Sequence, residues 1–188
     1  KKMGQRGTKP CDVVLENVRV PASNIIGGVP GVGFKTAMKV LDRGRLHISA
    51  LACGMAHRLI TDAVAYAKER KQFGKPIGDF QLIQGMLADS QAELYAGLSM
   101  VRDCAQRYDA KPAGKSDPEV SMLASCTKMF CTEMVGRVAD RAVQIHGGAG
   151  YIAEYKAERF YRDVRLLRLY EGTTQIQQLI IAKQLLRD

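Results

Sequence analysis

The sequence predicts an all-α protein: an up-and-down bundle of four-helix type with one additional C-terminal helix, preceded by a short β segment. Three observations support this prediction. Apolar residues recur every three to four residues over three long stretches, glycine and proline breaks separate the stretches, and a valine-rich run precedes the first one. Because each apolar stripe must be buried against another helix, long stripes joined by short breaks favour an antiparallel bundle.

The valine-rich run over residues 11–20 is the first expected element, and it ends at Pro21. It is expected to form one or two short strands. A glycine break at 27–31 follows, and a long helix is predicted over residues 32–70. The apolar stripe of this helix consists of Ile48, Leu51, Met55, Leu59, Ala63 and Ala67.

Two more long helices are predicted after the first one ends at the break containing Gly74, Pro76 and Gly78. The second covers residues 79–108, with a stripe of Ile83, Leu87, Leu94, Leu98 and Val101. A loop containing Pro112 and Gly114 separates it from the third, which covers residues 118–145 and has Pro118 in its first turn. The stripe of the third helix is Val120, Leu123, Thr127, Phe130, Met134 and Val138.

Two shorter helices complete the predicted fold. A glycine run at 147–150 interrupts the chain before a helix over residues 154–169. The last helix covers residues 174–186, and Thr174 and Gln177 have the spacing of a capping box at its start.

Composition limits the class of protein. A chain of 188 residues with 46% hydrophobic residues can bury a core and suits one domain, or one domain and a piece of another. Its start carries neither an initiator methionine nor an apolar signal segment, so we expect a piece of a longer protein. Charged residues interrupt every apolar stretch, and we expect no membrane span.

Cysteine and histidine spacing argues against disulfide and metal chemistry. The five cysteines are an odd number without a Cys-x-x-Cys pair, which favours a reducing compartment and gives no zinc motif. None of the three histidines lies three residues after a glutamate, as a di-iron bundle requires. No Gly-x-Ser-x-Gly motif is present, so we expect no metal site and no serine nucleophile.

The net charge of +9 leaves three interpretations open. Cations recur at three-residue steps in one predicted helix, at Lys156, Arg159, Arg162, Arg165 and Arg168. They could bind nucleic acid, a phosphate-rich small molecule, or only solvent and neighbouring acids. The sequence has no base-reading motif and no aromatic interleaving, so we expect no nucleic-acid partner.

The stretch from Leu169 to Gln177 contains the strongest candidate for chemistry. Glu171 lies there in a glycine-containing break between two helical runs. A carboxylate that loses water in such a place becomes a stronger base, which suits proton abstraction. The alternative is an acidic residue that the helix macrodipole favours near a helix N-terminus.

Two other breaks carry groups suited to a phosphate or a ring. Residues 69–74 place Arg70 and Phe73 at a helix end, and residues 144–148 end another helix with bare glycines. Glycine lets backbone N–H groups approach a ligand closely, and Arg70 can bind a pyrophosphate through two hydrogen bonds. With the Glu171 break, the 18–21 segment and the 31–34 opening, their order and spacing resemble the C-terminal domain of the acyl-CoA dehydrogenases over essentially the whole chain.

This resemblance implies a flavoprotein with an N-terminal helical domain, a middle β-domain and this bundle. Residues 1–27 would be the end of the β-domain with a linker, and residues 28–188 the bundle. The implied cofactor is FAD, the substrate an acyl-CoA, and the electron acceptor an electron-transfer flavoprotein. A homo-oligomer, tetramer or dimer, is expected, cytoplasmic in a bacterium and in the mitochondrial matrix in a eukaryote.

The resemblance also implies a role for particular residues. Glu171 would remove the α-proton of the acyl-CoA while the β-hydrogen leaves as hydride to FAD, and the Glu171 N–H would help polarise the thioester carbonyl. The implied FAD contacts are Arg70, Phe73, Gln81, Gln144, Ile145, His146, Gly147, Gly148, Thr173 and Gln175. The implied substrate contacts are Asp42, Arg43, Gly44, Arg45 and Gly172.

Gly44 separates this chain from one branch of that family. In the isovaleryl-type branch the base occupies the position of Gly44, whereas this chain has Glu171 in the last loop. Acyl chain length stays open, as does the choice between a dehydrogenase, an oxidase and a non-catalytic flavin- or CoA-binding or assembly module. The fragment alone is expected to be inactive.

Overall fold

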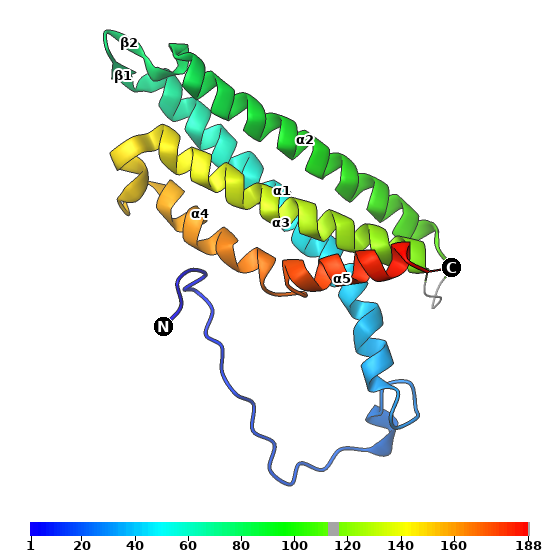
Figure 1. Cartoon of the computed structure of the whole chain (residues 1–188). Helices are drawn as coiled ribbons and strands as arrows, with labels where there is room; N and C mark the ends of the chain where they lie inside the picture. Colours follow the sequence, from blue (N-terminus) through cyan, green and yellow to red (C-terminus); the bar gives the residue numbers. More distant parts are fainter. Residues whose placement is uncertain (113–116, 188) are drawn as a thin grey trace.

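Long antiparallel helices dominate the computed structural model, which describes residues 1–112 and 117–187. Helices α1 (Gly33–Glu69), α2 (Gln81–Ala110) and α3 (Pro118–His146) alternate in direction, and α4 (Lys156–Val164) packs on α3 (Figure 1). Helix α5 (Thr174–Leu185) is the additional C-terminal helix. The predicted all-α bundle is therefore confirmed, while Gly114 of the predicted loop lies outside the described residues.

Short elements join the helices. Strands β1 (Lys71–Gln72) and β2 (Lys75–Pro76) form a small antiparallel hairpin between α1 and α2. The remaining elements are single 3-10 turns: η1 (Ala22–Asn24), η2 (Ile77–Asp79), η3 (Gly147–Tyr151) and η4 (Arg165–Arg168). The predicted helix over 154–169 is thus shorter, because its last turn tightens into η4, as helix ends commonly do.

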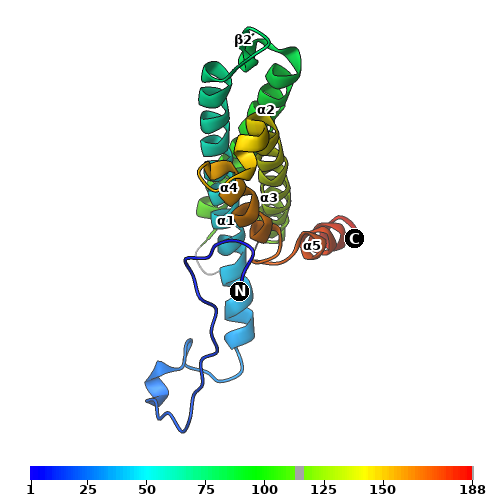
Figure 2. The same cartoon turned by 90° about the vertical axis from the view of Figure 1, so that its left-hand side faces the viewer.

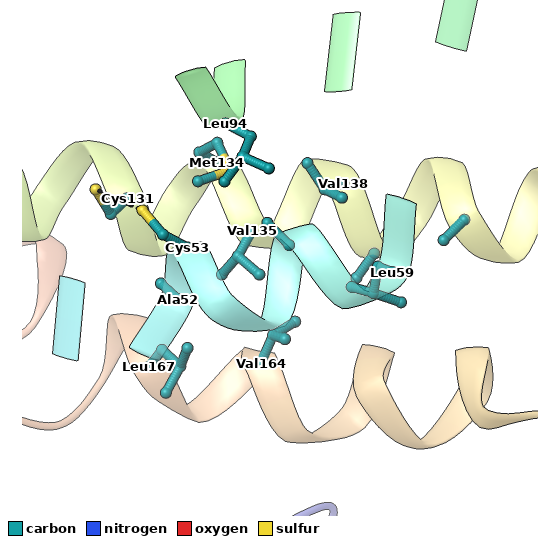
Figure 3. Close-up of a cluster of buried hydrophobic side chains, with 13 residues drawn as sticks. Ala52, Cys53, Leu59, Leu94, Cys131, Met134, Val135, Val138, Val164 and Leu167 are labelled. Carbon is teal, nitrogen blue, oxygen red and sulfur yellow. Dashed lines mark hydrogen bonds between the residues drawn. The ribbon is translucent and has the colours of Figure 1, made fainter. Parts of the chain in front are cut away.

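Helix α3 is central, since it contacts α1, α2, α4 and α5. Around its middle lies a core to which α1, α2, α3, α4 and η4 contribute (Figure 3). Leu51, expected in the α1 stripe, is 47% exposed, whereas Ala52, Cys53 and Ala56 are buried. The other predicted stripe residues of α1 do pack in the core: Ile48, Met55, Leu59, Ala63 and Ala67. The stripe is therefore confirmed except at Leu51, and small residues beside it widen the buried face, since small side chains let two helices approach closely.

The N-terminal region differs most from the prediction. Residues 11–20 are exposed and form no strand, and the start of α1 projects beyond the bundle with them (Figure 2). A strand needs a neighbour that pairs with its backbone groups, and no neighbouring strand is described here. The strand prediction for this segment is wrong for the described chain.

Candidate functional site

The loop between η4 and α5 holds Glu171 in an unusual backbone conformation. Glu171 has φ +55° and Gly172 has φ +87°, and both residues are half-buried. A non-glycine residue with positive φ is uncommon and costs about 1 kcal/mol or more. The loop conformation must therefore be maintained by its surroundings.

The Glu171 carboxylate packs against Gly44 of α1. A Cβ atom at position 44 would lie 2.5 Å from Glu171 Oε2, which is far inside van der Waals contact. Residues 44 and 171 thus face the same point in space although they lie far apart in the chain. Glycine at position 44 leaves the room that the carboxylate occupies.

The predicted substrate residues Asp42, Arg43 and Arg45, next to Gly44 on α1, differ in their surroundings. Arg45 is only 7% exposed, and its guanidinium binds Asp42 at 2.7 Å. Asp42 also accepts a hydrogen bond of 2.9 Å from Ser121 Oγ on α3, while Arg43 is exposed. Arg45 thus has a structural partner in Asp42, which in turn connects α1 to α3. Its predicted contact with a substrate stays a prediction.

A cavity of about 1110 Å³ lies at the end of the bundle that carries the β1–β2 hairpin. It brings together two segments that lie far apart in the sequence, residues 70–83 and 145–149. Of the expected FAD contacts, its lining contains Arg70, Phe73, Gln81, Ile145, His146, Gly147 and Gly148. Gln144, Thr173 and Gln175 do not line it.

An aromatic cluster in this cavity was not predicted. The rings of Tyr66 and His146 stack with centroids 4.4 Å apart, and Tyr155 meets both edge-on. His146 Nδ1 lies 2.7 Å from the Ala142 carbonyl oxygen, and since a carbonyl only accepts, Nδ1 must donate. Tyr66 lies on the α1 face between Ala63 and Ala67, a signal that could have placed it near the predicted segments.

Thr173, not Thr174, caps α5. The Thr173 hydroxyl accepts the Ile176 N–H at 3.3 Å, whereas the Thr174 hydroxyl donates to Glu133 Oε1 at 2.7 Å. The predicted capping residue is therefore wrong by one position, because the Thr174 hydroxyl is hydrogen-bonded to Glu133 on α3. Gln175 is exposed.

Two buried polar side chains beneath the Glu171 loop were not predicted from the sequence. Lys128 on α3 has no exposed surface, and its Nζ donates to the Gly172 carbonyl at 2.7 Å. Gln177 on α5 is equally buried, and its Nε2 donates to the carbonyls of Glu171 and Gly172 at 3.2 and 3.1 Å. The available signal was a lysine directly beside the apolar stripe of α3.

Burial changes the acidity of Lys128. It lowers the pKa of the ammonium to about 8, with the Arg45 charge acting in the same direction. Glu133 and Glu171 oppose this shift by attracting the positive charge. Lys128 thus remains mostly charged at neutral pH inside the protein.

Some cations of the basic run form ion pairs within the protein, and others are exposed to solvent. Arg162 pairs with Glu158 at 2.7 Å, and Arg168 pairs with Glu133 at 3.2 Å. Lys156, Arg159 and Arg165 are exposed. Part of the run therefore serves the packing of α4 and η4.

Neither a bilayer-crossing helix nor a metal centre is found in the described part of the chain. No described helix combines the length and apolarity that a bilayer crossing requires. Within residues 1–112 and 117–187, no three His, Cys, Asp or Glu side chains are grouped as metal ligands. All five cysteines are free.

These features define a helical-bundle domain that has a loop carboxylate packed against α1 and a glycine-lined cavity beside its hairpin. Residues 31–186 match the family described as acyl-CoA dehydrogenase, C-terminal domain. The chain belongs to the acyl-CoA dehydrogenase family.

Relatives match over nearly the whole chain. "Probable acyl-CoA dehydrogenase YngJ" of Bacillus subtilis is 46% identical over 99% of this chain and 47% of its own length. "Caffeyl-CoA reductase-Etf complex subunit CarC" of Acetobacterium woodii is 44% identical, over 99% of this chain and 47% of its own. The chain therefore spans about half the length of these relatives.

Solved structures share the fold. Butyryl-CoA dehydrogenase from Megasphaera elsdenii has a TM-score of 0.91 and 37% identity, covering 100% of this chain and 47% of that one. An acyl-CoA dehydrogenase from Bacillus anthracis complexed with FAD has a TM-score of 0.91 and 35% identity, covering 100% and 34%. The bundle therefore has the architecture of the part of each of these chains that it matches.

Proposed function

We propose that this chain is the C-terminal part of a flavin-dependent acyl-CoA dehydrogenase in which Glu171 removes the α-proton of the substrate. The observation that carries the proposal is the Glu171 carboxylate, held in a strained loop against Gly44. A fixed carboxylate beside a bound thioester can take a proton directly. FAD, when bound, supplies the acceptor for the β-hydride.

The cavity beside the hairpin fits part of a dinucleotide cofactor. Its lining offers the Arg70 guanidinium for a phosphate, the Phe73 ring for a flat group, and the backbone of Gly147 and Gly148 for close approach. The Bacillus anthracis relative is described with FAD. We assign Gln81, Ile145 and His146 to the same site; Gln144, Thr173 and Gln175 would meet FAD outside this cavity.

Substrate binding is assigned to the surroundings of Glu171, away from this cavity. Gly44 adjoins the Glu171 carboxylate and Gly172 follows Glu171 in the chain, so both would border the acyl thioester. Exposed Arg43 would meet the CoA moiety, while the Asp42–Arg45 pair would shape the wall beside it. These side chains orient a substrate so that its α-carbon faces the base.

The rest of the assembly lies beyond this chain. We propose that residues 1–27 end a β-domain and that residues 28–188 form the C-terminal bundle domain. The parent would be a homo-oligomer that passes electrons to an electron-transfer flavoprotein, and the relative from Acetobacterium woodii is named as a subunit of an Etf complex.

Reduction of an enoyl-CoA is a second candidate. The observation that favours it is the 44% identity to the caffeyl-CoA reductase subunit, close to the 46% identity to YngJ. Glu171 would then deliver a proton to the α-carbon, since the reverse of proton removal uses the same group. Both directions depend on the same carboxylate.

Anaerobic titration of the FAD-loaded full-length parent tests the proposal. Acyl-CoAs of different chain length should bleach the oxidised-flavin band of the parent but not of Glu171→Gln, and the matched control Glu119→Gln should behave like the parent. Glu119 is an exposed residue in the first turn of α3. Reoxidation of reduced flavin by an enoyl-CoA would favour the reductase, and rapid reoxidation by dioxygen an oxidase.

Three other results of this titration would contradict the proposal. Flavin that no acyl-CoA bleaches would contradict dehydrogenation, and a parent that binds no flavin would favour a non-catalytic assembly module. Bleaching in Glu171→Gln at the parent rate would remove Glu171 from the role of base.

A further inference from the structure

The peptide groups that follow Glu171 are held by two fully buried donors from different helices. Lys128 Nζ on α3 lies 2.7 Å from the Gly172 carbonyl oxygen. Gln177 Nε2 on α5 reaches the same oxygen at 3.1 Å and the Glu171 carbonyl at 3.2 Å. Neither side chain exposes any surface.

Burying a lysine ammonium is costly unless the arrangement has a purpose or a full set of partners. In the described residues the one hydrogen bond found for Lys128 Nζ is that to Gly172, and Arg45, Glu133 and Glu171 are the charges that act on it. Burial of this kind is expected where a charge-assisted hydrogen bond holds a strained segment in place.

Further contacts secure both ends of the loop. Glu133 of α3 forms an ion pair of 3.2 Å with Arg168, which lies before the loop. It also accepts a hydrogen bond of 2.7 Å from the hydroxyl of Thr174, which lies after the loop. The loop residues between them, Glu171 and Gly172, both have positive φ. The loop is therefore anchored at its ends by Glu133 and at its centre by Lys128 and Gln177.

We propose that Lys128 and Gln177 are positioning residues that fix the Glu171–Gly172 backbone and thereby hold the Glu171 carboxylate beside Gly44. This inference rests on the proposed role of Glu171 as the base. Neither side chain touches the reacting atoms in this arrangement; each acts through the carbonyl groups that it binds. The pair explains how a loop with two positive φ angles can present a carboxylate in one orientation.

Variants of the FAD-loaded full-length parent test the proposal. Lys128→Met and Gln177→Leu each remove a donor while retaining much of the side-chain volume. Ser125→Ala is the matched control, because Ser125 is buried on α3 and its hydroxyl has no partner among the described atoms. Hydrogen exchange of residues 170–176, read by mass spectrometry against an α2 peptide, reports on the loop without any need for turnover.

The proposal predicts two coupled effects. Loop amides should exchange about tenfold faster in both single variants, with α2 unchanged. Flavin reduction at saturating acyl-CoA should slow about ten- to hundredfold, while half-saturating acyl-CoA changes less than about threefold. Because both donors share the Gly172 carbonyl, the double variant should lose less than the product of the single losses.

Other results would overturn the proposal. Unchanged loop exchange in both single variants would show that the donors do not hold the loop, and so would equal losses in Ser125→Ala. If Lys128→Met does not fold, Gln177→Leu carries the same test from another helix. If wild-type flavin is never reduced by an acyl-CoA, the proposed function fails, and the exchange comparison still decides whether the donors position this loop.

Discussion

Two tight turns in this molecule share a backbone form but differ in what maintains it. Phe73 and Gly74 have φ +51° and +82°, and Glu171 and Gly172 have φ +55° and +87°. The first pair joins β1 to β2, where a two-residue turn with two positive φ values suits the twist of a hairpin. The second pair joins η4 to α5 and has no such local pairing.

Their surroundings differ accordingly. Phe73 is 92% exposed, and no atom lies within 4 Å of a Cβ placed on Gly74. A Cβ on Gly172 would lie 2.5 Å from the buried Gln177 Nε2. The hairpin turn is thus maintained locally and leaves its aromatic ring exposed, whereas the Glu171 turn is maintained by the core. The difference teaches that the same backbone form can depend on local pairing in one place and on packing in another.

Gly44→Ala should produce the largest functional effect. The new Cβ would displace the Glu171 carboxylate, because it would lie 2.5 Å from Oε2, and flavin reduction should fall about a hundredfold. The free energy of unfolding should stay level or rise by up to ~1 kcal/mol, because alanine favours a helix more than glycine does. Stopped-flow flavin bleaching and urea unfolding of the full-length parent measure the two effects; full activity in this variant would contradict the assigned position of the base.

The buried ammonium of Lys128 should make stability depend on pH. Its pKa is about 8 in the folded protein, below the usual value of 10.5, so the unfolded chain binds more protons between these two values. Wild-type stability relative to Lys128→Met should therefore rise with pH across this window, by roughly 2 to 3 kcal/mol. Urea unfolding of both proteins from pH 7 to 10.5 measures the difference, and a constant difference would mean that Lys128 titrates normally.

Alanine at the two turn glycines compares the turns directly, and Gly74→Ala should give the smallest effect. Gly172→Ala meets both a positive φ and the buried Gln177 amide, and should lower the free energy of unfolding by about 2 to 3 kcal/mol. Gly74→Ala meets only the positive φ and should lower it by about 1 kcal/mol. Thermal unfolding of the two full-length variants provides the comparison, and equal losses would mean that the core adds nothing to the Glu171 turn.

Much of the helical framework followed from local sequence. The bounds of α1, α2 and α3 fell within two residues of the predicted ranges, because apolar periodicity, the Pro118 start and glycine breaks act over a few residues. The strand prediction for residues 11–20 was wrong for the opposite reason, since a strand depends on a partner strand and the described residues place none beside this segment.

By itself the sequence determined, to within two residues, where the three long helices begin and end, and it determined which loop carries the candidate base, because helical hydrogen bonds and turn chemistry are local. Only the tertiary structure decided that Gly44 faces the Glu171 carboxylate, that Lys128 and Gln177 lie beneath it, and that two distant glycine-bearing segments share one cavity. These relations join residues far apart in the chain. They depend on how α1, α3 and α5 are rotated and packed against one another, which no local pattern specifies.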